Sequence, residues 1–376
     1  MFSLHVVQRR VGAVLTAAAL GAAAPAVLAT EVADTLTRAA APAARPEQSV
    51  LLSVASAGPR LVAVGERGLI VVSDDQGKSW RQVPVPLSVT LTAVSFPSAS
   101  KGWAVGHRGV ILATSDGGST WVQQLNGVQF AERALAQAQV QAKDVAQAAS
   151  PAASAASAAV NDAQALVRDR ADKPFLDVSF TDEQHGFAVG AYGLCATTQD
   201  GGKAWSSCMA QLPNPKGAHL YSIARSGTAV YIAGEQGVVL RSDDGVNYSA
   251  VPGPYTASLF CVGVAGNGDV VLGGLRGVAF VSTDQGHSFQ ALASGSQGSF
   301  SGAARLNDGR LAFANQLGQV LQYDTSSRRL KLVATPPLAP LSGLTQTSAG
   351  TLAAVGVRGA VALPTPPAPA SSSAKP

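Results

Sequence analysis

The stretch VGHRGVILATSDGGSTW, residues 105–121, contains the two turns that decide the fold. A Gly-x-x-Gly turn (106–109) joins two apolar runs, and an Asp-Gly-Gly turn follows and ends at Trp121. We expect glycine at both ends of the first turn to supply the positive φ angles that tight hairpins require. With LTAVSFP (91–97) before it and WVQQL (121–125) at its end, the stretch predicts four short antiparallel strands.

The Gly-x-x-Gly turn occurs seven times along the chain, once with Asn315 in place of the first glycine. The copies are GERG (65–68), GHRG (106–109), GAYG (190–193), GEQG (234–237), GLRG (274–277), NQLG (315–318) and GVRG (356–359). Their first positions are 40 to 44 residues apart, except for one interval of 84 residues. Four short strands in a unit of about 40 residues are typical of a β-propeller blade. The sequence therefore predicts an all-β fold, a seven-bladed β-propeller of four-stranded blades, over residues 49–363.

The second turn also recurs, with the pattern Ser/Thr-x-Asp-x-Gly-x-x-aromatic. We call it the Asp-box; its aspartate accepts hydrogen bonds from turn amides, and its aromatic residue is buried beneath the turn. In the fourth copy, Arg241 replaces the hydroxyl residue. Structural roles are predicted for Asp75, Trp80, Asp116, Trp121, Asp200, Trp205, Asp243, Tyr248, Asp284 and Phe289.

The long interval contains an insertion, residues 129–171, that is rich in Ala and Gln and lacks glycine. Apolar residues recur at helical spacing on both sides of Ser150-Pro151, which predicts an antiparallel α-helical hairpin between blades two and three. Its other face is too polar to span a membrane. The hairpin is either a docking arm or a spacer packed on the side of the propeller.

The two ends of the chain differ from the repeats. Residues 1–29 combine Arg9-Arg10, an apolar run and small residues before Ala29, which predicts a cleaved signal peptide and a periplasmic protein; the alternative is a membrane anchor. The last repeat ends after three strands, so we expect part of residues 30–48 to supply its outer strand and close the ring. Residues 364–376 are rich in Pro, Ser and Ala and are predicted to be disordered.

Charge and cysteine content exclude several classes of function. The formal charge is +4, and without Arg9 and Arg10 it falls to +2, which gives no support for nucleic-acid binding. The three cysteines show no zinc-site spacing, and no cofactor is predicted. Cys195 and Cys208 flank one turn of a predicted hairpin and could form a disulfide; the odd number of cysteines leaves at least one thiol or an intermolecular bond.

Strand alternation places all seven Gly-x-x-Gly turns on one face of the propeller, opposite the Asp-boxes. Their third positions are Arg67, Arg108, Tyr192, Gln236, Arg276, Leu317 and Arg358. Four arginines on a nearly neutral protein suggest a positive surface for carboxylates or an acidic peptide, so a partner-binding role is predicted for Arg67, Arg108, Arg276, Arg358, Tyr192 and Gln236. The alternative is that these arginines are merely solvated turn residues, as we expect for His107.

The segments GWAVGHRGVILATSDGGSTW and HGFAVGAYGLCATTQDGGKAW resemble the photosystem II stability and assembly factors of cyanobacteria and plastids. The resemblance covers residues 49–363 apart from the insertion. It implies a non-enzymatic protein that binds newly made reaction-centre protein on the lumenal side. It also implies an arginine patch, which corresponds by turn position to Arg67, Arg108, Arg276 and Arg358.

Three other functions remain open at this stage. The insertion is similar to that of relatives from non-photosynthetic bacteria, often encoded beside exporters of the RND type, which implies an exporter accessory protein. Asp-boxes also suggest a sialidase-like glycosidase, whose chemistry needs a tyrosine nucleophile with a glutamate partner. Tyr192 is the tyrosine on the arginine face, and no such pair is evident. A small-molecule carrier is the third. We expect a monomer that binds a membrane-protein subunit or exporter from the periplasmic side.

Overall fold

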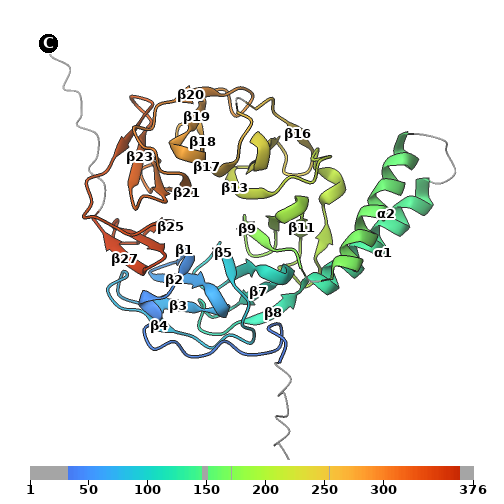
Figure 1. The fold of residues 1–376 in the computed structure, drawn as a ribbon, viewed down its shortest axis with the longest axis horizontal. Helices are drawn as coiled ribbons and strands as arrows, with labels where there is room; N and C mark the ends of the chain where they lie inside the picture. Colours follow the sequence, from blue (N-terminus) through green and yellow to red (C-terminus); the bar gives the residue numbers. More distant parts are fainter. Residues whose placement is uncertain (1–32, 146–150, 171, 254, 365–376) are drawn as a thin grey trace, which may run out of the picture. The chain divides into compact units, whose positions relative to one another are not determined.

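The computed structural model describes residues 33–145, 151–170, 172–253 and 255–364, which form a ring of seven antiparallel sheets (Figure 1). The predicted seven-bladed β-propeller is confirmed. Six blades have four strands, whereas the seventh has three within the described residues. All of these sheets belong to one compact unit, Asp34–Pro376. The predicted signal peptide, residues 1–29, lies outside the described residues.

The strands of each blade pair in chain order, so that neighbours in sequence are neighbours in the sheet. Blade one contains β1 (Leu51–Ala57), β2 (Arg60–Gly65), β3 (Ile70–Ser73) and β4 (Arg81–Gln82). Blade two contains β5 (Leu91–Ser95), β6 (Gly102–Gly106), β7 (Ile111–Thr114) and β8 (Val122–Leu125). Blade three contains β9 (Phe175–Phe180), β10 (Gly186–Gly190), β11 (Cys195–Thr198) and β12 (Ser206–Ser207). Blades four and five contain β13 (Leu220–Ser226), β14 (Ala229–Gly234), β15 (Val239–Ser242) and β16 (Tyr248–Ala250); and β17 (Leu259–Val264), β18 (Val270–Gly274), β19 (Ala279–Ser282) and β20 (Gln290–Leu292). Blades six and seven contain β21 (Phe300–Arg305), β22 (Leu311–Asn315), β23 (Val320–Asp324) and β24 (Arg329–Leu332); and β25 (Leu341–Gln346), β26 (Leu352–Gly356) and β27 (Gly359–Leu363).

Apolar cores lie between consecutive blades. In the core between blades one and two, Val62 and Val72 pack with Ala104, Leu112 and Trp121. Because the second and third strands are covered on both faces, their sequences are continuous apolar runs rather than alternating ones. Burial of each valine or leucine side chain contributes about 1.5–3 kcal/mol. These cores hold the blades in register and so fix the positions of the turns at their ends.

The N-terminal segment does not form the expected outer strand of blade seven. The described residues 33–48 contain no strand; they form a hydrogen-bonded turn at Asp34–Arg38 and a 3-10 turn at Pro46–Gln48. The chain before it instead follows blade one, where Ala40 donates its N–H to the Val85 carbonyl (3.0 Å) and Ala43 donates to Oε1 of Gln82 (2.8 Å). The polar backbone of this segment is satisfied there, which leaves the far side of β27 without a fourth strand.

The insertion forms two helices, α1 (Gly127–Val145) and α2 (Pro151–Asp169), as predicted for a hairpin between blades two and three. The Asn126 side chain accepts the backbone N–H groups of Val128 and Gln129 (both 3.1 Å) and so caps α1. Gln137 fastens α1 to the outer strand of blade three through two hydrogen bonds with the Ser207 backbone (2.9 and 3.0 Å). The hairpin therefore rises from the rim of the ring (Figure 1). None of the helices in the described residues is long and apolar enough to cross a membrane.

Cys195 and Cys208 are joined by a disulfide, and Cys261 is a buried free thiol. Cys195 begins β11, and Cys208 follows the two-residue strand β12. The backbone N–H of Cys208 donates to the Cys195 carbonyl (3.0 Å), so the covalent bond reinforces the outer edge of a blade whose last strand is very short.

Candidate functional site: the turn face

The Gly-x-x-Gly turns are held by close backbone contacts. A Cβ atom at Gly106 would lie 2.2 Å from the Thr90 carbonyl oxygen, and one at Gly65 would lie 2.1 Å from that of Val50. The first glycine is extended rather than left-handed, with φ of −176° at Gly106. The expectation that both glycines supply positive φ is therefore wrong for the first one. Glycine is required there for steric reasons, because the chain entering the inner strand of the same blade passes directly against it.

The third residue of the turn adopts the left-handed conformation in five blades. The φ angles lie between 53° and 58° at Arg67, Arg108, Tyr192, Gln236 and Arg276. Non-glycine residues rarely adopt this conformation, and it carries a cost of order 1 kcal/mol at each position. Four of these side chains are exposed, and Arg108 is half-buried. The repeated turn thus presents one side chain per blade on a single face, which we call the turn face.

Blades six and seven present their third residue differently. In blade six, Oδ1 of Asn315 accepts the N–H groups of Leu317 and Gln319 (both 3.0 Å), so the side chain organises the turn. The turn of blade seven is one residue shorter than that of blade one, because Gly356 pairs directly with Gly359 in a two-residue hairpin. Arg358 is therefore on the turn face, but its backbone differs from that of the other three arginines.

One of the four arginines is engaged by the N-terminal segment. Nη1 of Arg108 lies 2.8 Å from Oδ1 of Asp34 and also donates to the Thr35 hydroxyl (3.3 Å). The Leu36 N–H, with the charge of Arg108, holds the pKa of Asp34 below its usual value. Arg108 thus helps to anchor the segment that crosses blade one.

The other three arginines remain available to solvent. Arg67, Arg276 and Arg358 are exposed, and within the described ranges none of them forms an ion pair. Glu235 is half-buried beside this surface and accepts the backbone N–H of His219 with its carboxylate (3.2 Å). The structure places the arginines around the turn face, one per blade, rather than in one cluster.

Between the arginines of blades two and five, the turn face carries an aromatic run that the sequence did not reveal. The Tyr192 ring lies edge-on to His219 at 4.7 Å, His219 contacts Tyr221 at 6.2 Å, and Tyr221 contacts Phe260 at 5.2 Å. Nζ of Lys173 lies 5.3 Å above the Tyr192 ring. The available signal was positional, since Tyr221 and Phe260 are each the second residue of an inner strand.

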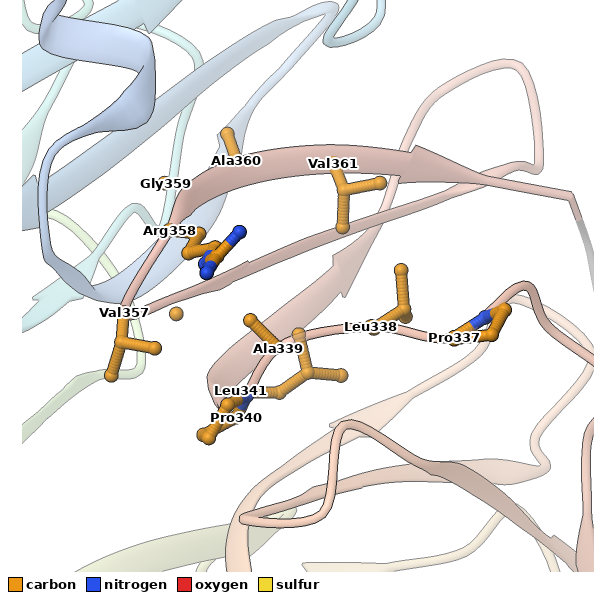
Figure 2. Close-up of a pocket in the computed structure, with 11 residues that line it drawn as sticks. Pro337, Leu338, Ala339, Pro340, Leu341, Val357, Arg358, Gly359, Ala360 and Val361 are labelled. Atoms are coloured by element: carbon orange, nitrogen blue, oxygen red, sulfur yellow. The ribbon is translucent and has the colours of Figure 1, made fainter.

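Arg358 borders a hollow of about 580 Å³ beside blade seven (Figure 2). Most of its lining is apolar and comes from the connection that leads into β25 and from the hairpin between β26 and β27. The lining residues are Pro337, Leu338, Ala339, Pro340, Leu341, Gly356, Val357, Arg358, Gly359, Ala360 and Val361. The hollow thus combines an apolar wall with a single cationic group.

The Asp-boxes lie at the opposite ends of the blades and act as turn staples. Oδ1 of Asp116 accepts the N–H groups of Ser119 and Thr120 (both 2.9 Å) and the Thr114 hydroxyl (2.8 Å). Partial burial raises the pKa of Asp116, but hydrogen bonds of this kind lower it by more and hold it at about 2. Trp121 is buried, and its indole donates to the Gly118 carbonyl (3.1 Å). Equivalent hydrogen bonds are made by Asp75, Trp80, Asp200 and Asp284. The aromatic residues of two of these boxes differ. The Trp205 indole donates to Gln124, and Phe289 packs against the core between blades four and five.

The fourth Asp-box contains a correction. Asp244 accepts the N–H groups of Val246 and Asn247 (2.8 and 2.7 Å) and the Ser242 hydroxyl (2.9 Å), as the box aspartate does elsewhere. The prediction of Asp243 is therefore wrong. This copy is one residue shorter between its aspartate and its glycine, so Ser242 supplies the hydroxyl, and Asp243 instead forms an ion pair with Arg241. Tyr248 still closes the turn, donating to the Gly245 carbonyl (3.3 Å).

The described residues contain no group of three or more His, Cys, Asp or Glu side chains arranged to hold a metal ion. The turn face offers guanidinium groups, aromatic rings and one apolar hollow. Chemically, this combination suits recognition of carboxylate-bearing segments by charge and by ring contacts.

Known proteins that resemble this chain agree with the architecture. A solved structure described as YCF48 bound to D1 peptide superimposes with a TM-score of 0.61 over 85% of this chain and 94% of that chain, at 15% identity. YCF48 from Cyanidioschyzon merolae gives a TM-score of 0.59 over 88% of this chain and 98% of that chain, also at 15% identity. At this identity the likeness concerns the fold.

Sequence comparisons lead to the same group. The Photosystem II assembly lipoprotein Ycf48 of Synechococcus sp. (strain CC9902) is 31% identical over 151 residues, which are 38% of this chain and 44% of the relative. That of Parasynechococcus marenigrum (strain WH8102) is 41% identical over 64 residues, which are 17% of this chain and 19% of the relative. The chain thus matches less than half the length of these curated relatives. The model of the family described as Photosynthesis system II assembly factor YCF48 matches residues 72–146 and 156–325. The chain therefore belongs to the photosystem II assembly factor YCF48 family.

Proposed function

We propose that this protein is a non-enzymatic binding scaffold on the periplasmic side of the membrane, where its turn face holds a segment of a membrane-protein complex during assembly. The observation that carries the proposal is the repeated exposure, at equivalent turns, of arginines that form no ion pair within the described residues, Arg67 and Arg276 in particular. A guanidinium is always charged and matches a carboxylate with two parallel hydrogen bonds. The partner segment is accordingly expected to carry acidic side chains or a terminal carboxylate.

The aromatic run between the arginines supports a polypeptide ligand. Tyr192 and Tyr221 offer ring surface with a polar tip, which is typical of protein-recognition surfaces. A segment lying across the turn face would meet arginines at its two ends and rings between them. One solved relative carries a D1 peptide, and by family membership we propose a comparable extracytoplasmic segment as the ligand here.

The surroundings of Tyr192 argue for binding rather than for sialidase-type catalysis. A sialidase nucleophile needs a glutamate partner, whereas the Tyr192 ring has Lys173 and His219 as its neighbours. The Tyr192 backbone N–H donates to Nδ1 of His219 (2.8 Å), which fixes the imidazole beside the Tyr192 ring. This arrangement holds the ring in place, and among the described residues no carboxylate is hydrogen-bonded to the Tyr192 hydroxyl.

The proposed location rests on the predicted signal peptide and on the disulfide. A disulfide between Cys195 and Cys208 is favoured in an oxidising compartment such as the periplasm.

Affinity capture from detergent-solubilised host membranes tests the proposal. Immobilised wild-type protein is compared with the Arg67→Ala/Arg276→Ala variant and with Arg305→Ala/Arg329→Ala, a matched pair of exposed arginines at the Asp-box ends of the blades. We expect one membrane protein, identified by mass spectrometry, whose recovery falls at least about fivefold only in the turn-face variant. Equal recovery in both variants contradicts the role of the arginines. The identity of the captured protein also separates a subunit of an assembling complex from an RND-type exporter.

A further inference from the structure

The outer strands of the other blades show how the edge of a third strand is normally covered. In blades one, three, four and six, the residue after the outer strand donates its N–H to the carbonyl of the residue that begins the third strand. These acceptors are Ile70, Cys195, Val239 and Val320, at distances of 2.8 to 3.0 Å. Because an antiparallel ladder alternates, every second residue of the third strand directs both its N–H and its C=O outwards.

Blade seven leaves this edge open. Val355 pairs with Ala360 as Val64 pairs with Ile70, so Ala360 occupies the position of Ile70. The N–H and C=O groups of Ala360 and Ala362 therefore point away from β26. Within the described residues no strand lies on that side, and Ala362 is exposed where the third strands of the other blades are almost entirely buried. An uncovered strand edge of this kind is a template for strand addition.

The hollow beside β27 lies where a side chain of an added strand would go. Directly opposed residues of an antiparallel pair place their side chains on the same face of the sheet. Val361 lines the hollow, so the residue paired with Val361 would project into it, against Leu338 and Pro337 (Figure 2). The volume of about 580 Å³ accommodates a large apolar side chain.

The direction of β27 decides which end of an added strand meets Arg358. β27 runs from the turn face towards the Asp-box face, so an antiparallel strand ends at the turn face. Its carboxyl-terminal end therefore arrives beside Arg358, which is exposed and forms no ion pair within the described part of the chain. A terminal carboxylate or an acidic side chain complements this charge.

The residues that follow β27 are poorly suited to this place. Positions 364–376 consist of Pro, Thr, Ala, Ser and Lys, so they offer no large apolar side chain for the hollow. Four prolines at 364, 366, 367 and 369 also lack the N–H that a ladder requires. The N-terminal segment packs its 3-10 turn, Pro46–Gln48, against the start of β27 at Gly359 but adds no strand there, and its residues Ala40 and Ala43 are hydrogen-bonded along blade one.

We propose that the open edge of β27 accepts an extended segment of another protein by antiparallel strand addition, with an apolar side chain opposite Val361 and a carboxylate beside Arg358. Such a segment would complete the fourth strand of blade seven. Arg358 is shared with the turn face, but the inference rests on the backbone edge and the hollow. It does not depend on the membrane-protein partner of the proposed function.

The test uses a fluorescein-labelled peptide, Thr-Leu-Thr-Leu-Val with a free carboxyl terminus, and purified full-length protein. Its sequence follows the outer strand of blade six, where Leu332 pairs with Leu321, the counterpart of Val361. Fluorescence anisotropy measures the dissociation constant. We expect replacement of the second leucine by serine to weaken binding about tenfold, because the hollow is then unfilled. Amidation of the carboxyl terminus should weaken binding about fivefold in wild-type protein and not at all in Arg358→Ala.

Ala362→Pro is the decisive variant, because its N–H points to the open side and is not used by the fold. We expect it to weaken peptide binding at least about tenfold while thermal unfolding stays close to that of wild type, and Ala362→Ser to bind normally. Unchanged binding by Ala362→Pro overturns the proposal. So does binding that appears only after deletion of residues 365–376, since the chain's own tail would then be the occupant. Arg67→Ala/Arg276→Ala should bind the peptide normally, which separates this edge from the proposed function.

Discussion

Asp177 on β9 gives a sharp prediction about the dependence of stability on pH. Its Oδ1 accepts the Val178 N–H (2.8 Å) and its Oδ2 accepts the Ile223 N–H of the neighbouring blade (2.7 Å). Burial of the carboxyl between the two inner strands outweighs these bonds and raises its pKa from 3.8 to about 7. The folded protein therefore binds this proton more tightly than the unfolded chain does. The resulting stability is fully present below about pH 4 and is lost as pH rises through 7.

The magnitude follows from the two pKa values. At about 1.4 kcal/mol for each tenfold difference in proton affinity, ionisation of Asp177 removes at most about 4 kcal/mol. Part of the residue is solvent-accessible, so we expect about 2 kcal/mol to be lost between pH 5 and pH 8. Asp177→Asn cannot ionise, but it keeps only one acceptor for two N–H groups, which costs about 1 kcal/mol. The variant should thus be less stable than wild type at pH 5 and more stable at pH 8.

Urea unfolding followed by tryptophan fluorescence at pH 5, 6, 7 and 8 measures this inversion. Asp75→Asn is the control: hydrogen bonds from the side chain and backbone of Ser79 and from Ser73 hold the pKa of Asp75 at about 2, so its loss lowers stability by an offset that does not change over this range. If the free energies of unfolding of wild type and Asp177→Asn change in parallel with pH, ionisation of the Asp177 carboxyl costs no stability and the prediction is wrong.

Three further predictions concern the fold. Replacing Cys195 and Cys208 by serine should lower the free energy of unfolding by about 3 kcal/mol, the loop-entropy value for a bridge with a sequence separation of 13, and a reductant should lower wild type equally. Asp116→Ala should cost about 1–2 kcal/mol in urea unfolding at neutral pH, and because the pKa of Asp116 is about 2, the difference should shrink only as pH falls below about 4. Gly106→Ala should prevent normal folding or lower the melting temperature by well over about 5 °C, since its Cβ would lie 2.2 Å from the Thr90 oxygen.

The fold was predictable because each blade repeats two local signals. The Gly-x-x-Gly turn and the Asp-box each depend on contacts within a few residues or with the adjacent strand, so they are visible in the sequence. Counting them predicts the blades, and the change in composition at 129–171 predicts the helical hairpin. The shift from Asp243 to Asp244 was missed because a one-residue deletion leaves two aspartates in a row, and only the hydrogen bonds distinguish them.

The candidate site was only partly predictable. Turn position singled out Arg67 and Arg276, which lie on exposed residues with positive φ. It did not reveal the pairing of Arg108 with Asp34, which are 74 residues apart, because nothing local specifies the path of the N-terminal segment. The aromatic run was missed for the same reason, since it joins single residues from separate blades.

The most direct test of the binding role of the turn face is site-specific photo-crosslinking in living cells. A photo-reactive phenylalanine replaces Gln236 on the turn face or, as the control, Lys203 in an exposed Asp-box loop. Crosslinked peptides are identified by mass spectrometry. We expect the substitution at 236 to capture an acidic extracytoplasmic segment of a membrane protein and the substitution at 203 not to capture it. Capture of the same segment from 203 but not from 236 would contradict it.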